Sequence, residues 1–310
     1  MNKVSSDTFF VGLEILKQFF MHTLNWEVVM KRFFEILGFL SLICFSFFYT
    51  EKTIDVVKEV DDIMITLKEQ APKYQEKAEN AKIDGMFMIP GISGKIVNLQ
   101  KSYEEMKHYG KFHPNLLVYD KVSPEISIKD RYDKYIQTGN PKKRQVSFIF
   151  IVGEKDNPSP FINILKKRKV TGTFFIDSSW LEKNQTELID FIHHKFTVGN
   201  YSNQGDYSHE SFVWMDTIIK RVGGQKQGYC LVEKENKKAL KNCQLQKDYT
   251  IYPNIMIKEN PYSELIEQVK NGSIILMKMN RKVKNELPMM ITYLKQKGYE
   301  IVNLENLLDE

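Results

Sequence analysis

The amino-acid sequence predicts an α/β domain with a mainly parallel sheet in its C-terminal half, preceded by an apolar segment long enough to span a membrane. Three observations support this prediction. Strand-like and helix-like patterns alternate over residues 145–310. An apolar run fills residues 33–50. The 310 residues are 42% hydrophobic and 12% aromatic, which is enough for one large domain or two modest ones with a full core.

The alternation after residue 145 has a regular order. Short β-branched and aromatic runs predict strands at Val146–Val152, Gly172–Ile176, Phe196–Val198, Gly228–Val232, Tyr249–Tyr252, Ser273–Met277 and Glu300–Val302. Amphipathic spacing predicts helices at Pro160–Arg168, Gln185–His194, Ser211–Arg221, Pro261–Asn271 and Lys284–Lys297. Seven strand units of this kind suit a closed or nearly closed barrel, or a doubly wound sheet.

The apolar run reads FFEILGFLSLICFSFFY over residues 33–49, and Glu35 is its only charged residue. Extended by a few residues, it reaches the length of about 20 that a spanning helix needs. Lys31 and Arg32 precede it and acidic residues follow it. The positive-inside rule therefore predicts a retained single-pass anchor over residues 33–50, with a cytoplasmic N-terminus and a C-terminal domain outside the cell. The alternative is a buried core helix.

Residues 1–32 form the predicted cytoplasmic N-terminal segment. Met30, Lys31 and Arg32 together resemble a natural start, with an initiator and a basic region before the apolar run. Residues 1–29 are then an upstream extension from a misplaced start. In the other interpretation they form an amphipathic helix, with Phe9, Phe10, Leu13, Leu16, Phe19 and Phe20 on one side. Both interpretations stay open.

Two further segments are expected between the anchor and the α/β domain. Residues 51–82 place apolar side chains at three- and four-residue spacing, from Ile54 to Leu67, which predicts a helical stalk that Pro72 interrupts. Residues 83–144 are expected to form a small membrane-proximal region. It ends in a linker at Gly139-Asn140-Pro141, before the basic residues 142–144.

Charge and cysteine content narrow the class of protein. The formal net charge of +5 is small for this length, and no basic stripe or reading motif indicates a nucleic-acid partner.

Cys44 lies in the apolar run and is expected to be an inert buried or lipid-facing thiol. Cys230 and Cys243 are close enough in sequence to form a disulfide outside the cell, worth about 3 kcal/mol by loop entropy. In the cytosol they would be two free thiols.

Five segments, in order, resemble the polysaccharide deacetylase family, carbohydrate esterases that share the nodulation-protein-B homology domain. The family's first strand ends Thr-Phe-Asp-Asp-Gly, where this chain has Ile149–Gly153. Its Ala-Thr-Phe-Phe strand is similar to Gly172–Phe175, and its Gly-Asn-His turn is similar to Val198–Gly205. Its late Gly-Ser-Ile-Ile-Leu-Leu-His strand is similar to Gly272–Lys278, and its last helix and strand to the chain's ending after Lys297. The resemblance implies a distorted (β/α) barrel over residues 145–310.

The motif positions that carry the family's chemistry are replaced. The resemblance puts Ile151 where the general base stands, and Val152 where an aspartate binds the metal. Tyr201 and Gly205 stand where the two ligand histidines are, and Lys278 stands in place of the histidine that acts as general acid. A catalytic divalent ion needs about three protein ligands and an open position for water. Aliphatic side chains and glycine offer no side-chain lone pair, so the sequence predicts a pseudoenzyme without a cofactor.

Replacement ligands near the second motif are the alternative. The ligand-type residues there are His193, His194, Asp206, His209 and Glu210. Adjacent histidines on a helix point about 100° apart and do not readily chelate one ion. The family's Arg-Pro-Pro segment aligns loosely with Tyr229–Val232, which brings no arginine.

The sequence predicts a membrane-anchored, catalytically inactive protein that binds an envelope glycan such as peptidoglycan at the C-terminal ends of its strands. The expected contact residues are Asn200, Tyr201, Asp206, His209 and Lys278. One alternative is an active deacetylase that holds a divalent metal with replacement ligands. The other is a membrane-tethered platform for protein assembly, whose contacts lie in residues 83–140.

Overall fold

The computed structural model describes residues 26–59, 61–225 and 227–310. Of residues 26–29, 50–59 and 209 it describes only the backbone. The chain divides into two compact units. The first contains the described residues up to Lys73 together with Asn98–Val118, and the second contains Tyr74–Val97 and Tyr119–Glu310. Each unit is described by itself. Residues 1–25, with the two interpretations of the N-terminal segment, lie outside the described residues.

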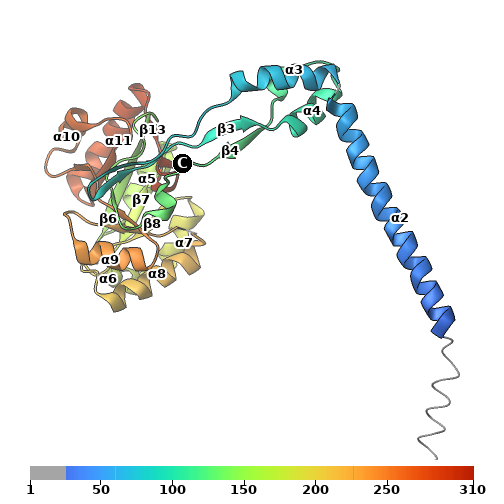
Figure 1. Ribbon diagram of the computed structural model, residues 1–310. Coiled ribbons are helices and arrows are strands. Elements are labelled where there is room, and N and C mark those ends of the chain that lie inside the picture. The colour runs from blue at the N-terminus through green and yellow to red at the C-terminus, as the bar shows by residue number, and fades with distance from the viewer. Residues whose placement is uncertain (1–25, 60, 226) are drawn as a thin grey trace, which may run out of the picture. The chain divides into compact units, whose positions relative to one another are not determined.

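The first unit is helical. Helix α2 (Trp26–Glu59) contains the predicted apolar segment (Figure 1). Its stretch Met30–Tyr49 has a mean hydropathy of 1.6 and is long and apolar enough to cross a membrane. Large apolar side chains point outward along it, with Phe39 71% and Phe47 73% exposed. Contiguous exposure of this kind is unfavourable in water.

Helices α3 (Asp62–Gln70) and α4 (Leu99–Lys107) complete this unit with a short 3₁₀ turn at Pro114–Leu116. The Asp61 side chain caps α3 by accepting from the Ile63 amide at 2.8 Å, and it also accepts from the Tyr103 hydroxyl of α4 at 3.1 Å. The prediction of a helical stalk over residues 51–82 is wrong beyond residue 74. A 3₁₀ turn at Ala71–Tyr74 contains Pro72, and the residues after it are extended, with Glu76 bridged to Lys95.

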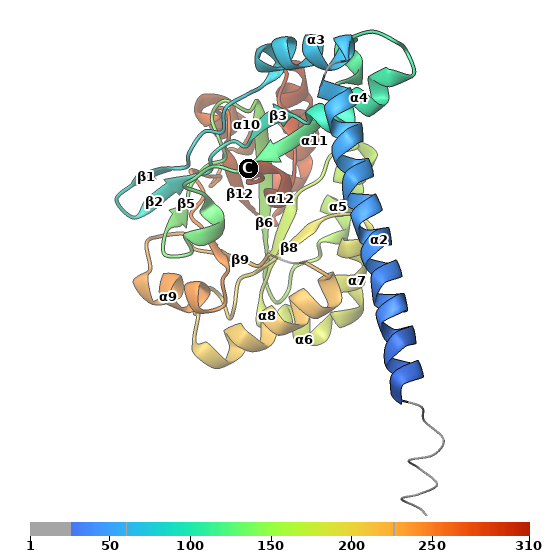
Figure 2. The ribbon, with the colours of Figure 1, turned by 45° about the vertical axis from the view of Figure 1, so that its right-hand side comes forward.

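The second unit is built on one large curled sheet, with helices around it (Figure 2). Its strands run in the order β1-β2-β5-β10-β9-β8-β7-β6-β12-β11, with β13 beside β6. Every pair is parallel except β1 with β2. The strands are β1 (Lys82–Asp84), β2 (Phe87–Ile89), β5 (Tyr135–Ile136), β6 (Gln145–Val152), β7 (Thr173–Ile176), β8 (Thr197–Asn200), β9 (Tyr229–Leu231), β10 (Tyr249–Ile251), β11 (Ile255–Met256), β12 (Ile274–Lys278) and β13 (Glu300–Ile301). A separate ribbon pairs β3 (Gly94–Val97) with β4 (Tyr119–Val122). The predicted α/β class with a mainly parallel, barrel-like sheet is confirmed.

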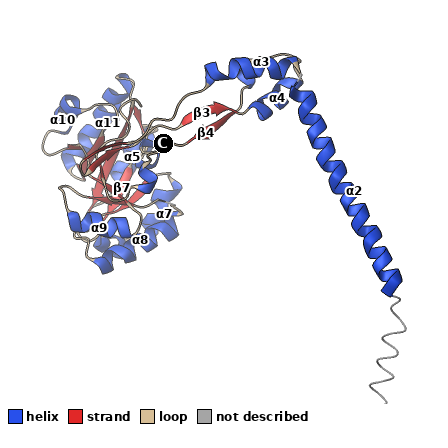
Figure 3. Cartoon of the chain, viewed as in Figure 1, coloured by secondary structure: helices blue, strands red, loops and turns tan. Residues whose placement is uncertain are grey.

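The helices of this unit alternate with its strands along the chain, as predicted. They lie around the sheet (Figure 3). They are α5 (Ser159–Lys167), α6 (Ser178–Lys183), α7 (Gln185–His193), α8 (His209–Gly223), α9 (Lys237–Leu245), α10 (Pro261–Gln268), α11 (Arg281–Gln296) and α12 (Leu304–Leu307), with a 3₁₀ turn at Ile128–Asp130. The sequence did not predict α6, α9 or α12. Helix α9 buries only Ala239, Leu240 and Cys243, so its apolar periodicity is faint. Cys243 forms a disulfide with Cys230 of β9, with their Cα atoms 6.4 Å apart.

The α/β unit begins earlier than residue 145, where the sequence placed its boundary. Strands β1, β2 and β5 extend the sheet next to β10, and the expected linker at Gly139-Asn140-Pro141 is part of the folded unit. Asn140 is buried and donates to the Pro90 carbonyl at 2.8 Å, and the Gly139 amide donates to the Gly272 carbonyl at 2.8 Å. A Cβ on Gly139 would lie 2.7 Å from the Leu307 side chain, so glycine serves close packing there rather than flexibility.

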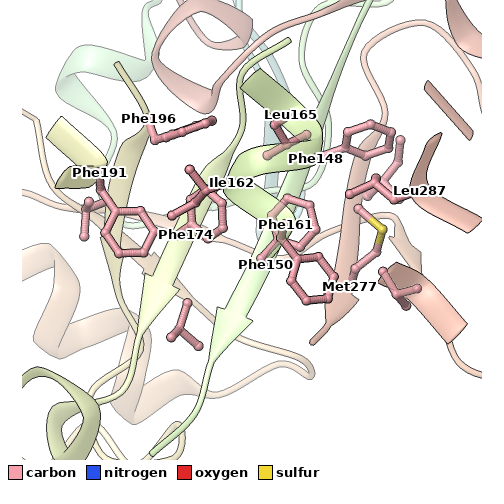
Figure 4. Packing of buried hydrophobic residues seen from close by; sticks show 14 of the residues in the cluster. Phe148, Phe150, Phe161, Ile162, Leu165, Phe174, Phe191, Phe196, Met277 and Leu287 are labelled. Carbon is pink, nitrogen blue, oxygen red and sulfur yellow. The ribbon is translucent and has the colours of Figure 1, made fainter. Parts of the chain in front are cut away.

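Strand β6 is buried on both faces and separates two apolar clusters. Phe148, Phe150 and Val152 join the cluster formed with the surrounding helices, where the rings of Phe150 and Phe174 stack at 5.0 Å (Figure 4). Ile149 and Ile151 join the other cluster, formed by side chains from strands across the curled sheet. Burial on both faces explains why β6 reads as a continuous apolar run.

The side chain of Glu310 accepts hydrogen bonds from residues of the segment before β6. Its side chain is 3% exposed and accepts from the Gly91 amide at 2.6 Å, the Ile128 amide at 3.3 Å and the Ser127 hydroxyl. A buried carboxylate with three donors is well satisfied, and its loss leaves these donors without an acceptor.

We predict that Glu310→Ala lowers the free energy of unfolding by about 2–4 kcal/mol, because buried amides lose their acceptor. Urea unfolding of the full chain in neutral detergent measures this change. Asp309→Ala is the matched control. Its exposed carboxylate pairs with Lys121 at 3.2 Å, so its loss should cost less than about 1 kcal/mol. Equal effects of the two substitutions would contradict the assignment.

Candidate functional site

The carboxyl ends of the central strands meet at one edge of the sheet. The register aligns Val152 of β6 with Ile176 of β7, and Ile176 with Asn200 of β8. On the other side of β6, Lys278 of β12 is aligned with Ile151. Parallel strands therefore bring residues that are far apart in sequence to the edge where barrel-type proteins place their sites.

A three-residue network crosses this edge. The Tyr201 hydroxyl donates to Glu233 Oε1 at 2.8 Å, and Lys278 Nζ lies 3.1 Å from Glu233 Oε2. Tyr201 follows β8, Glu233 follows β9 after Val232, and Lys278 ends β12. Both oxygens of one carboxylate are thus engaged by side chains of the protein itself.

The sequence did not predict Glu233 as a site residue. The feature that could have identified Glu233 is its position two residues beyond the end of β9, on the same edge as Tyr201 and Lys278. The segment compared with the family's Arg-Pro-Pro motif ended one residue before it. Residues that directly follow a strand of a parallel barrel lie at its C-terminal edge, where such folds place their sites.

The environment of Tyr201 keeps its hydroxyl protonated. Burial raises the pKa of the Tyr201 phenol well above its usual value, and the hydrogen bond and negative charge of Glu233 raise that pKa further. A phenol binds a metal ion as phenolate, which this environment disfavours. Tyr201 therefore acts as a hydrogen-bond donor at neutral pH.

The loop after β8 is fixed by hydrogen bonds within the protein. Asn200 is buried, donates to the Phe212 carbonyl at 3.0 Å and accepts from the Ser202 amide at 2.8 Å. The buried carboxylate of Asp177 accepts from the Ser179 amide at 2.9 Å and the Gln204 amide at 2.6 Å. These two polar side chains hold the loop and have little capacity left for a ligand.

The other predicted residues are dispersed. Val152 packs among the surrounding helices, whereas Ile151 faces the interior cluster that Tyr201 contacts. Asp206 is exposed. Gly205 has a φ of +79°, and a Cβ there would lie 3.5 Å from the Tyr201 ring. His209 begins α8, and its side chain lies outside the described part of the structure.

The cavity at this edge is small. It measures about 130 Å³ and is lined by Tyr201, Gln204, Gly205, Leu231, Val232, Glu233, Lys234 and Asn236. Enclosed small-molecule sites usually measure about 300–1,000 Å³. A sugar chain would therefore lie over this edge rather than inside it. Within the described residues, no three His, Cys, Asp or Glu side chains are grouped as a metal site would require.

The curled parallel sheet with surrounding helices matches the fold of the polysaccharide deacetylases of carbohydrate esterase family 4. The structural neighbours confirm this resemblance. The pseudoenzyme BA3943 of Bacillus anthracis superimposes with a TM-score of 0.62 and 25% sequence identity, over 81% of this chain and 96% of that one. A mutant of that pseudoenzyme with restored enzymatic activity matches with the same TM-score. A search with family models found none that matches the sequence.

Two curated proteins of Bacillus subtilis are also similar. The uncharacterized protein YlxY is 27% identical over 277 residues, 83% of this chain and 87% of YlxY. The peptidoglycan-N-acetylmuramic acid deacetylase PdaA is 23% identical over 208 residues, 59% of this chain and 78% of PdaA. The solved structure of PdaA has a TM-score of 0.50 at 21% identity, which supports a shared fold.

We predict that Tyr201→Phe lowers the free energy of unfolding by about 1–3 kcal/mol, because a half-buried hydrogen bond to a carboxylate is lost. Lys278→Met should lower the free energy of unfolding by less than about 1 kcal/mol, because its ammonium is largely exposed.

Glu233→Gln should lower the pKa of Tyr201, although burial keeps this pKa above its usual value. NMR of ¹³C-labelled tyrosine measures the change. Glu235→Gln is the control. An unchanged Tyr201 pKa in Glu233→Gln would contradict the network.

Proposed function

We propose that this protein is a membrane-anchored, extracytoplasmic pseudoenzyme of the polysaccharide deacetylase type, which binds envelope glycan without hydrolysing it. The observation that carries the proposal is the Tyr201–Glu233–Lys278 network at the strand edge. It lies at the edge where, by the resemblance, active polysaccharide deacetylases have their two metal-ligand histidines and the histidine that acts as general acid.

The residues at this edge do not suit metal-assisted hydrolysis. Such hydrolysis needs ligands with free lone pairs and a bound water that becomes acidic. Ile151, Val152 and Gly205 offer no side-chain donor atom. The Glu233 carboxylate is already paired with an ammonium group, which would repel a nearby cation.

Membrane anchoring is supported by helix α2. Its apolar stretch Met30–Tyr49 rises about 30 Å at 1.5 Å per residue, which matches the thickness of the hydrocarbon core. Lys31 and Arg32 stand at its beginning, which favours a cytoplasmic N-terminus. The disulfide between Cys230 and Cys243 suits an oxidising compartment outside the cell.

Glycan binding is supported by the exposed polar groups at the strand edge and by the relatives. Lys278 is 64% exposed at its side chain, and Glu233 33%. Asp206 is also exposed. These groups present an ammonium and carboxylates to a sugar chain lying across the shallow edge. PdaA is named as a peptidoglycan deacetylase, and its substrate is a glycan of this kind.

The test uses the full chain in neutral detergent and peptidoglycan freed of its anionic polymers. We expect the protein to cosediment with this peptidoglycan and to release no acetate from it beyond a heat-inactivated sample. Lys278→Gln combined with Asp206→Asn should weaken cosedimentation about 10-fold, because two polar contacts are lost. Lys270→Gln, at an exposed position in the loop before β12 at the opposite end of the strands, is the control and should bind like the wild type.

Two outcomes would overturn the proposal. Acetate release that a chelator abolishes would show an active hydrolase with replacement ligands. Failure of the wild type to cosediment would leave a protein-assembly platform as the function of the unit.

A further inference from the structure

The loops that precede the strands, at the edge opposite the candidate site, are strongly basic. Six exposed cations define what we call the basic loop face: Lys166, Lys167, Arg168, Lys169, Lys195 and Lys295. They come from the ends of α5, α7 and α11. Within the described part of the chain, none of the six forms a salt bridge with an acidic side chain.

Contacts between the loops hold these cations near one another. Lys295 Nζ donates to the Arg168 carbonyl at 2.6 Å, which joins the ends of α11 and α5. Lys166 Nζ lies 2.9 Å from His194 Nε2, which joins α5 to the end of α7. The Thr171 hydroxyl donates to the Lys195 carbonyl at 3.0 Å. The basic loop face is therefore one continuous surface.

The electrostatics of helix ends do not account for this surface. One cation in the last turn complements a helix dipole, but an unbroken run of four cations from Lys166 to Lys169 begins in the last turn of α5 and continues beyond its end. Adjacent like charges repel each other, and the loops at the edge of the candidate site mix signs. At the opposite edge, the loops after β6 and β9 carry Glu154, Asp156, Glu233 and Glu235 beside Lys155 and Lys234.

Two of the six cations, both lysines, occupy a backbone conformation that disfavours them. Lys169 has a φ of 53° and Lys195 a φ of 60°, in the left-handed region just after α5 and α7. At the ends of α8 and α11 the corresponding residues are Gly224 and Gly298, which adopt this conformation without a Cβ penalty. Lysine at such positions destabilises the fold relative to glycine, as it also does at Lys247 after α9, which has a φ of 57°. Glycine at Lys169 and Lys195 therefore removes a charge without straining the backbone.

A cavity of about 510 Å³ adjoins the basic loop face, between the beginnings of β7 and β8 and helix α12. Lys195 lines it. Asn306 and Glu305 line it as well, together with the apolar side chains of Ile192 and Phe196. The Gln225 amide and the Thr171 hydroxyl are bonded to backbone groups of Val198 and Lys195. A hollow of this size with both polar and apolar walls suits a polyol or sugar unit, which has hydroxyl groups and an apolar carbon face.

We propose that the basic loop face docks a linear polyanionic polymer in which phosphate groups alternate with hydroxylated units. The six cations would pair with successive phosphates, and the cavity beside Lys195 would take the polyol or sugar between them. A flat anionic lipid surface would meet the cations but would not enter the cavity. Because this surface and the candidate site lie at opposite ends of the strands, the two can bind at the same time.

The experiment measures binding of the full chain, in neutral detergent, to fluorescent poly(glycerol phosphate), with neutral dextran as the uncharged comparison. We expect affinity to fall about 10-fold or more when salt rises from about 50 to about 200 mM. Lys166→Gln with Lys167→Gln should weaken binding about 10-fold at low salt. Lys155→Gln with Lys258→Gln removes two exposed cations elsewhere and should leave binding unchanged.

A second pair of substitutions separates a binding role from a structural one. Lys169→Gly with Lys195→Gly should raise the melting temperature, because glycine relieves the left-handed backbone, and should still weaken polymer binding about 10-fold. The proposal is overturned by equal binding of dextran, by equal losses in the control pair, or by no binding at all. Binding only to mixed micelles of phosphatidylglycerol would show a lipid-docking surface instead.

Discussion

Burial of β6 on both faces constrains the arrangement of the rest of the second unit. Its side chains alternate between a cluster with the surrounding helices and a cluster inside the curled sheet. Its neighbours β7 and β12 must run parallel to it in a fixed register, because a one-residue slip would exchange the two faces. That register places the loops after β8, β9 and β12 together, and so brings Tyr201, Glu233 and Lys278 to one edge.

If the proposed function holds, the same edge explains how this chain keeps the fold of the polysaccharide deacetylases without their chemistry. The scaffold needs apolar strands and tight loops, which are present. Metal-assisted catalysis would need unpaired donor atoms at the strand ends. The side chains there are aliphatic, or, in Glu233, a carboxylate already bonded to Tyr201 and Lys278. The structural likeness to a pseudoenzyme of this family agrees with such a separation. The polar groups that remain are suited to surface contact rather than to activating water.

Much of this arrangement was predictable from the sequence. Long apolar strands with both faces buried, such as β6, and helices with strong periodicity, such as α11, were found within a few residues. Short elements were missed because β5 and β11 have two residues each and show no periodicity. The boundary at residue 145 was wrong because Gly139 and Asn140 have turn chemistry but serve close packing. Glu233 was missed because its role depends on neighbours more than 30 residues away in sequence.

The proposed pseudoenzyme should bind no divalent ion at the strand edge. Calorimetric titration of zinc chloride into the untagged, chelator-treated full chain at neutral pH measures such binding. We expect no saturable one-to-one binding, because the side chains that the structure describes at this edge do not offer three free ligands. Stoichiometric binding that Glu233→Gln or Asp206→Asn abolishes would contradict this expectation, since those carboxylates would then be replacement ligands.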